Sequence, residues 1–274
     1  MLKYTDGTYF HTNIQINAII NWIKDYFITN GNPNTKAVIG ISGGKDSTVA
    51  AALLVKALGP DRVIGVLMPE GRQLDIHNSY EVCEHLGIKY YEINIGDTCT
   101  ALYEAIDKAY DYDHCVKDNP AVSTNAPARI RMTTLYTIAS LVGGRVCHTG
   151  NASEAEIGYT TKFGDLAGDF SLLQDFTVTE ILEMGDALEL PFHLVHKAPS
   201  DGMSGKTDEE KIGLTYNIID NYIRNKEIPE KMEDYERLRT LSDSARHKNR
   251  ILYSIPSPYR LMLDEEGKEH GGYF

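Results

Sequence analysis

The chain has 274 residues, of which 42% are hydrophobic and 24% charged, so it can bury the core of one large domain. Asp and Glu number 39 against 27 for Lys and Arg, and the net charge of -12 argues against binding of nucleic acid through its phosphates. No apolar run reaches the roughly 20 residues of a membrane-spanning helix, and residues 1–10 lack the apolar stretch of a signal peptide. We therefore expect a cytoplasmic protein that binds neither nucleic acid nor a membrane.

The first half of the chain alternates between helical and strand patterns. An amphipathic helix is predicted at 12–27, with Thr12 and Gln15 at capping-box spacing. Strands are then predicted at 37–41, 63–67, 89–93 and 145–149, and helices at 49–58, 75–86, 98–110 and 129–142. This alternation is typical of an α/β fold with a doubly wound parallel sheet flanked by helices.

The remaining segments predict one domain over residues 1–274. Residues 111–128 contain Pro120 and Pro127 without periodicity, which predicts a long loop, either a lid over the site or a surface loop with no catalytic part. Capping-box spacings at Thr177 with Glu180 and at Thr207 with Glu210 predict two later helix starts. We expect the sheet core at about 37–150, a ligand-binding and helical part at about 151–255, and a tail at 256–274.

The four cysteines indicate no metal or disulfide framework. Cys83, Cys99, Cys115 and Cys147 are dispersed, without a Cys-x-x-Cys pair or a nearby His at zinc-finger spacing. Reduced structural thiols are the expectation.

A glycine-rich turn joins the first predicted parallel strand to the next helix. Residues 42–47 read Ser-Gly-Gly-Lys-Asp-Ser, so successive backbone N–H groups and a helix N-terminus can converge on a phosphate. Asp46 is a poor phosphate partner but a suitable Mg²⁺ ligand. The spacing matches neither the Walker pattern nor G-x-G-x-x-G. The sequence of the turn therefore indicates a binding site for a nucleotide with magnesium, rather than an ordinary glycine-rich turn that binds no ligand.

This turn resembles the signature of the N-type ATP pyrophosphatases, which cleave ATP between the α and β phosphates and adenylate a substrate. Further segments resemble NAD synthetase in order and spacing, over about residues 13–253. They are Arg-Ile-Arg-Met at 129–132, Thr-Gly-Asn with Ser-Glu at 149–154, Gly-Tyr-Thr-Thr-Lys-Phe-Gly-Asp at 158–165, Lys-Ala-Pro-Ser-Asp at 197–201 and His247-Lys248. The resemblance implies an adenine nucleotide alpha hydrolase-like fold.

The resemblance also implies a reaction. It is the ATP- and Mg²⁺-dependent amidation of nicotinic acid adenine dinucleotide (deamido-NAD) by ammonia, which gives NAD, AMP and pyrophosphate through a nicotinyl-adenylate, carried out by a homodimer. One domain leaves no room for a glutaminase, so free ammonia is the expected donor. The alternatives are another adenylating member of the superfamily, acting on tRNA or a purine nucleotide, and a non-catalytic nucleotide sensor.

Site residues follow from the resemblance position by position. The implied ATP-binding residues are Gly40, Ile41, Ser42, Gly43, Gly44, Lys45, Asp46, Ser47, Thr149 and Ser200. The implied deamido-NAD contacts are Arg129, Lys162, Asp169, His247 and Lys248. Asp46 and Glu154 would hold Mg²⁺, and Asp46 and Lys162 are the catalytic candidates.

Two positions depart from the family pattern. Pro127 and Val178 stand where many members have a lysine, the second of which contacts ATP. Lys45 inside the turn is a candidate to compensate for the missing charge near the phosphates.

Overall fold

The computed structural model describes residues 2–4, 7–110, 115–197 and 207–249. A five-stranded sheet in the order β5-β4-β3-β6-β7 forms its centre, and every neighbouring pair of strands is parallel. The strands are β3 (Lys36–Gly40), β4 (Val63–Leu67), β5 (Lys89–Glu92), β6 (Gly144–His148) and β7 (Phe170–Ser171). The predicted doubly wound α/β fold is confirmed. The two-residue strand β7 was not predicted, and it extends the sheet beyond residue 150.

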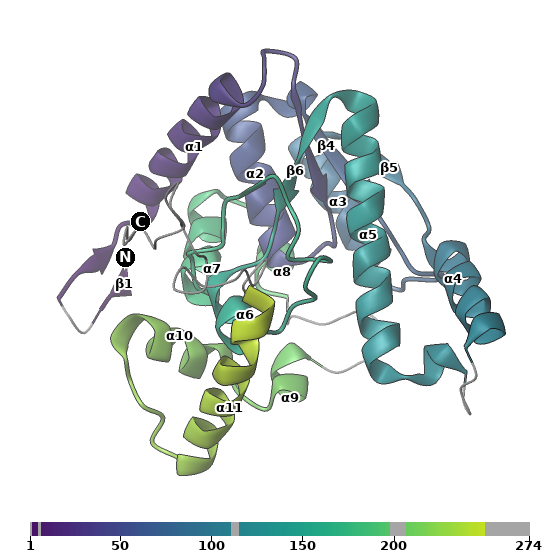
Figure 1. Ribbon diagram of the computed structural model, residues 1–274. Coiled ribbons are helices and arrows are strands. Elements are labelled where there is room, and N and C mark those ends of the chain that lie inside the picture. The colour runs from purple at the N-terminus through teal and green to yellow at the C-terminus, as the bar shows by residue number, and fades with distance from the viewer. Residues whose placement is uncertain (1, 5–6, 111–114, 198–206, 250–274) are drawn as a thin grey trace, which may run out of the picture.

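Helices cover both faces of the sheet (Figure 1). On one face Ile39 and Cys147 pack with the apolar residues of α1 (Thr12–Thr29), α2 (Lys45–Leu58), α3 (Ile76–Leu86), α7 (Val178–Ala187) and α8 (Phe192–Val195). On the other face Val38 and Val146 pack with α5 (Pro120–Val142). Neighbouring residues point to opposite faces because side chains alternate along a strand, so both faces of these strands are apolar.

A second apolar cluster lies beside the sheet and is built from the back half of the chain. Ile157, Val178 and Leu238 belong to it, and it unites α6 (Ala152–Ile157), α10 (Tyr216–Asn225) and α11 (Met232–Asn249) with the start of α7. The short helix α9 (Asp208–Ile212) joins this group. The chain begins with a two-stranded hairpin, β1 (Leu2–Lys3) and β2 (Tyr9–Phe10), and η1 (Pro60–Arg62) is a single 3₁₀ turn.

The predicted loop at 111–128 is wrong for residues 116–128. A 3₁₀ turn, η2 (Val116–Asp118), is followed at Pro120 by α5, and α4 (Gly96–Ala109) precedes them. Pro120 fits the first helical position, where no N–H donor is needed, and the side chain of Asn119 caps the helix by accepting from the Ala121 N–H at 3.0 Å. Pro127 lies inside α5, where proline is rare, which is why the sequence predicted a break. Residues 111–114 lie outside the described part of the chain.

Helix starts were predicted with mixed success. Thr177 and Thr207 cap α7 and α9 with complete capping boxes, as predicted. The Thr12 box is wrong, because Thr12 is already helical and His11 precedes the helix without a side-chain cap. No helix within the described part of the chain is long and apolar enough to cross a bilayer.

Candidate functional site

The glycine-rich turn lies at the carboxyl end of β3. Gly43 has φ +76°, and a Cβ there would lie 2.7 Å from the Cβ of Asn78, so the turn requires glycine on both conformational and steric grounds. The Ser47 hydroxyl accepts from the Ser42 N–H at 3.3 Å and lies 3.1 Å from the Ser42 hydroxyl, which closes the turn across its mouth. Helix α2 begins at Lys45, so residues 45–47 form its first turn rather than part of the loop.

Gly40 and Ile41 support the turn from below. A Cβ on Gly40 would lie 3.3 Å from the Met68 Cε, and the Ile41 N–H donates to the carbonyl of Val66 at 3.0 Å. Ile41 is 3% exposed. These two residues therefore fix the position of the turn relative to the sheet.

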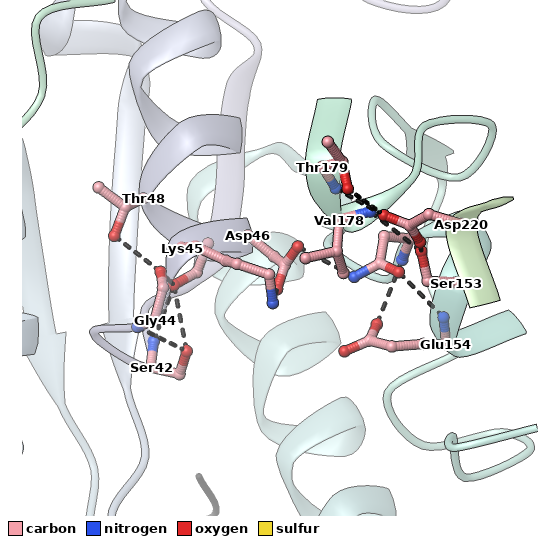
Figure 2. Close-up of polar contacts among 12 residues, drawn as sticks. Ser42, Gly44, Lys45, Asp46, Thr48, Ser153, Glu154, Val178, Thr179 and Asp220 are labelled. Atoms are coloured by element: carbon pink, nitrogen blue, oxygen red, sulfur yellow. Dashed lines mark hydrogen bonds and ion pairs between the residues drawn. The ribbon is translucent and has the colours of Figure 1, made fainter. Parts of the chain in front are cut away.

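Asp46 lies where the front and back halves of the chain meet. Lys45 forms an ion pair with it at 2.9 Å, and the side-chain amide of Asn151 donates to its second oxygen at 3.0 Å. Figure 2 shows Lys45 and Asp46 of α2 opposite Ser153 and Glu154 of α6. Residues separated by more than 100 positions thus share one polar cluster.

A capping box at the start of α6 holds Glu154 in the same cluster. Asn151 caps α6 by accepting from the Glu154 N–H at 3.0 Å, and the Glu154 carboxylate accepts from the Asn151 N–H at 3.2 Å. Burial and the nearby charge of Asp46 raise the pKa of Glu154 to about 8. The two negative charges therefore repel each other in a buried place, and a nearby cation would relieve that repulsion.

Lys45 balances part of this negative charge. Burial alone would lower its pKa, but Asp46 and Glu154 outweigh burial and the pKa of Lys45 is raised, so the side chain is cationic. Its Nζ lies 5.3 Å from the centre of the Tyr216 ring. The side chain is 5% exposed and therefore belongs to the interior of the site.

Val178, where the resemblance implies a lysine in many members of the family, is part of the apolar cluster that also contains Tyr216. It is 5% exposed. Lys45 lies beside this cluster, over the ring of Tyr216.

Behind the site, Asp220 connects three helices. Its carboxylate accepts from the Ser153 hydroxyl at 2.5 Å, from the Thr179 N–H at 2.8 Å and from the Thr179 hydroxyl at 2.6 Å (Figure 2). The Ser153 hydroxyl also accepts from the Val178 N–H at 3.0 Å. Burial raises the pKa of Asp220, against these hydrogen bonds. Asp220 of α10 therefore holds α6, and with it Glu154, against the start of α7.

Four of the five residues implied to contact deamido-NAD come together around residues 158–162. Arg129 Nε donates to the carbonyl of Lys162 at 3.2 Å, and Lys162 Nζ donates to the carbonyl of His247 at 3.1 Å. Lys248 Nζ donates to the carbonyls of Gly158 at 2.7 Å and Thr160 at 2.8 Å. The end of α11 is thus joined to the segment that follows α6.

Asp169 lies apart from this group. Its carboxylate accepts from the Val146 N–H at 2.7 Å in the middle of β6, and it lines a cavity of about 730 Å³ with Tyr26 and Arg145. Thr149 directly follows β6, at the same edge of the sheet as the turn. Ser200 lies outside the described residues.

Sequence reasoning missed three residues of the site. Asn151 stands three positions before Glu154, a spacing that signals a helix cap and was readable. Tyr216 and Asp220 carry no local signal, because only the packing of α10 against α6 brings them to the site.

Comparisons with known proteins place this geometry in a family. A family model described as NAD synthase matches residues 15–255. The chain belongs to the NAD synthase family. An NH(3)-dependent NAD(+) synthetase of Alkaliphilus metalliredigens is 34% identical over 252 residues, which is 89% of this chain and 98% of that protein. Another, of Methanococcoides burtonii, is 40% identical over 191 residues, 69% of this chain and 70% of that protein.

A solved structure of an NMN synthetase from Francisella tularensis superposes with a TM-score of 0.80 at 31% identity, covering 90% of this chain and all of that one. The NAD synthase family therefore accounts for both the fold and the order of the motifs along the chain.

Proposed function

We propose that the polar cluster at Asp46 and Glu154 supports adenylation of the nicotinate carboxylate, followed by attack of ammonia on the nicotinyl-adenylate. As a member of the NAD synthase family, the chain is a carbon–nitrogen ligase that uses ATP and ammonia to convert deamido-NAD into NAD. The observation that carries the proposal is the hydrogen bond from Asn151 to Asp46, which connects the glycine-rich turn to the helix that bears Glu154.

The chemistry explains why two carboxylates and a glycine-rich turn belong together. A carboxylate resists ammonia because its carbonyl is electron-rich and its oxygen is a poor leaving group, so it must first be activated. When the carboxylate attacks the α-phosphorus of ATP, pyrophosphate leaves and negative charge builds on the phosphate oxygens. We propose that backbone N–H groups of the glycine-rich turn and the N-terminus of α2, which begins at Lys45, stabilise that charge.

The two carboxylates support the proposal of a magnesium site. Asp46 and Glu154 offer the oxygen ligands that Mg²⁺ prefers, and the raised pKa of Glu154 reflects a place where a second negative charge is unfavourable without a cation. We propose that both residues hold Mg²⁺, which when bound would neutralise charge on the departing pyrophosphate. Lys45 provides a fixed protein charge beside them.

The proposed contacts to deamido-NAD come from α5, the segment after α6 and the end of α11. Arg129, Lys162 and the end of α11 form the group from which we propose contacts to deamido-NAD, with Lys162 as the catalytic cation. Thr149 and Ser200 are proposed to contact ATP. The contribution of Asp169 is proposed from the resemblance, at the cavity that it shares with Arg145.

We also propose that the protein acts as a homodimer. Helix α5 has 23 residues, of which Pro127 and Ala139 are buried, and Leu141 near its end is 76% exposed. A partner packed along α5 would cover this surface. The cytoplasmic location and the single-domain boundaries stay predictions from the sequence.

The decisive experiment is pyrophosphate release from ATP with Mg²⁺, measured with and without deamido-NAD and ammonium, with NAD detected enzymatically. Release that depends on deamido-NAD and is accompanied by NAD supports the proposal. Release only with a different acceptor would retain adenylation and reject the substrate. ATP binding without release would favour a nucleotide sensor.

A mononucleotide is the second candidate substrate. The observation that favours it is the match to the NMN synthetase of F. tularensis at a TM-score of 0.80. Nicotinic acid mononucleotide presents the same carboxylate to ATP and ammonia, so the same site would carry out its amidation. Parallel measurement of kcat/KM for the mononucleotide and for deamido-NAD shows whether the site also accepts the mononucleotide.

A further inference from the structure

The Lys45 ammonium contacts two groups from different halves of the chain. Its Nζ forms an ion pair with a carboxylate oxygen of Asp46 at 2.9 Å (Figure 2), and it also lies over the ring of Tyr216, 5.3 Å from the ring centre. Both Lys45 and Tyr216 are buried. The attraction between a cation and the face of an aromatic ring is strongest where water is excluded, so this contact is well placed to hold the lysine.

The ring of Tyr216, rather than its hydroxyl, is the group that attracts Lys45. The hydroxyl is buried and makes no hydrogen bond to any of the described residues. Burial and the charges of nearby carboxylates, Glu154 first, raise the pKa of Tyr216, so the phenol stays neutral and cannot form an ion pair with the lysine. The interaction that is left is that of the ammonium with the electron-rich face of the ring.

Helix α10 presents this ring from a fixed position. The Tyr216 N–H donates to the carboxylate of Glu209 at 2.7 Å. One turn further along the helix, Asp220 connects α10 to α6 and to the start of α7. The ring is therefore anchored to the back half of the chain, whereas Lys45 begins the helix that follows the glycine-rich turn.

A lysine at the start of α2 needs such a contact because its side chain is flexible. The four-carbon stem has many rotamers, and those that turn away from Asp46 would leave the charge of this carboxylate unpaired. An unpaired carboxylate in the first turn of α2 would repel a phosphate bound at the glycine-rich turn. The ion pair reduces this repulsion, and the ring of Tyr216 favours the rotamers of Lys45 that form it.

We propose that Tyr216 is a positioning residue for ATP binding, because its ring holds the Lys45 ammonium against Asp46 and the phosphates of ATP then meet a neutralised carboxylate. The inference rests on the proposed binding of ATP at the glycine-rich turn. It makes the start of α10, which carries no phosphate-binding motif, a part of the ATP site.

Fluorinated phenylalanines at position 216 test the ring directly. Phenylalanine, 4-fluorophenylalanine and 3,4,5-trifluorophenylalanine have nearly the same shape, but fluorine withdraws electrons from the ring face and weakens its attraction for a cation. Binding of ATP with Mg²⁺ is measured by calorimetry without deamido-NAD, so that no turnover occurs. We expect the Kd for ATP to rise along this series by about fivefold from Tyr216→Phe, its reference. An equal Kd throughout the series would overturn the proposal.

A double-mutant cycle with Lys45 separates positioning from a general effect on the fold. Tyr216→Met fills much of the same space without a ring, so its Kd for ATP should exceed that of Tyr216→Phe about fivefold. When Lys45→Met is added to both variants, this difference should shrink to less than about twofold, because the ring acts only through the lysine. A fivefold difference that persists without the lysine would contradict the positioning role.

Tyr222→Met is the matched control. Tyr222 lies on the same helix and packs against the same apolar cluster as Tyr216, so its substitution also removes a ring from this cluster. It should bind ATP as the wild type does, and a loss as large as that of Tyr216→Met would reject a specific role for Tyr216. If Tyr216→Met folds poorly, the fluorinated series keeps the packing and decides alone.

Failure of the proposed function gives a different result. If ATP does not bind at the glycine-rich turn, the wild type shows no heat of binding, or Lys45→Met leaves the Kd for ATP unchanged. If only the role of Tyr216 is wrong, the wild type binds ATP, Lys45→Met weakens binding, and the Kd values of the fluorinated series coincide.

Discussion

The side-chain amide of Asn151 donates to the carboxylate of Asp46 at 3.0 Å across 105 positions of sequence. The other end of the same amide caps α6 by accepting from the Glu154 N–H. One side chain therefore sets the distance between the two proposed magnesium ligands. Its two hydrogen bonds can be tested separately.

Asn151→Ala should lose both contacts, while Asn151→Ser should keep the helix cap and lose the bond to Asp46. A missing cap costs about 1 kcal/mol, so the alanine variant should unfold at lower denaturant than the serine variant. Both should show about tenfold lower kcat/KM at limiting Mg²⁺. Wild-type activity in the serine variant would show that the bond to Asp46 has no role.

Asp220→Asn should weaken the hydrogen bonds that hold α6, and with it Glu154, in place. The carboxylate accepts three hydrogen bonds from Ser153 and Thr179, and an amide cannot accept all three with the same strength. We expect a loss of about 1–3 kcal/mol in stability and a higher Mg²⁺ concentration for half-maximal activity. Raising Mg²⁺ should restore much of kcat, which a general folding defect would not allow.

The control for Asp220 is Asp186→Asn on α7, whose carboxylate pairs with His196 at the surface. Exposed pairs contribute about 1 kcal/mol or less, so this variant should keep the wild-type response to Mg²⁺. The same shift in both variants would contradict a positioning role for Asp220.

Val178→Lys tests whether Lys45 already supplies the missing charge. A lysine at this buried position should lower stability by roughly 2 kcal/mol or more, while the KM for ATP stays unchanged. Lys45→Met should raise the KM for ATP about tenfold, because it removes the cation beside Asp46. Val178→Met controls for the change in size. A clear fall in the KM for ATP in Val178→Lys would show that the charge is still missing.

His148 should make the protein sensitive to acid. Burial lowers the pKa of His148 to about 4, against an ordinary value of 6.5, while Nδ1 lies 2.8 Å from the Ser171 hydroxyl. Below pH 6.5 His148 binds a proton in the unfolded chain but not in the folded chain. The free energy of unfolding therefore falls as the pH drops from 6.5 to about 4. The full loss is about 3 kcal/mol at most.

Guanidinium unfolding at pH 7.5 and pH 5 measures this effect. His148→Asn keeps a polar atom near Ser171 and cannot be protonated, so it should lose less stability than the wild type between the two pH values. It should be less stable at pH 7.5, because the smaller side chain leaves space between Gly150 and Gly168. Parallel pH profiles of the two proteins would rule out His148 as the origin.

The sheet was predictable because β3 and β4 are short apolar runs bounded by turn signals, and each is buried on both faces. Pro127 misled the analysis, since proline usually ends a helix and here α5 continues through it. Strand β7 has two residues, too few for any periodicity. Such features depend on tertiary contacts that local patterns do not contain.

For the candidate site, the glycine-rich turn carried its own signal, because Gly43 needs a positive φ and α2 starts directly after it. Glu154 and Lys162 were reached by resemblance to a family. Tyr216 and Asp220 were missed because α10 meets α6 only in the folded chain.

The bond between Asn151 and Asp46 has a consequence for the order in which the protein matures. A nascent chain that has emerged through α5 already contains the whole glycine-rich turn but none of α6. Such a chain lacks Glu154 and the Asn151 side chain that orients Asp46. Nucleotide bound with magnesium would therefore stabilise those chains in which β6 has joined the sheet. The ligand would then act as a folding checkpoint as well as a substrate, and abundant ATP would protect newly made protein from proteolysis.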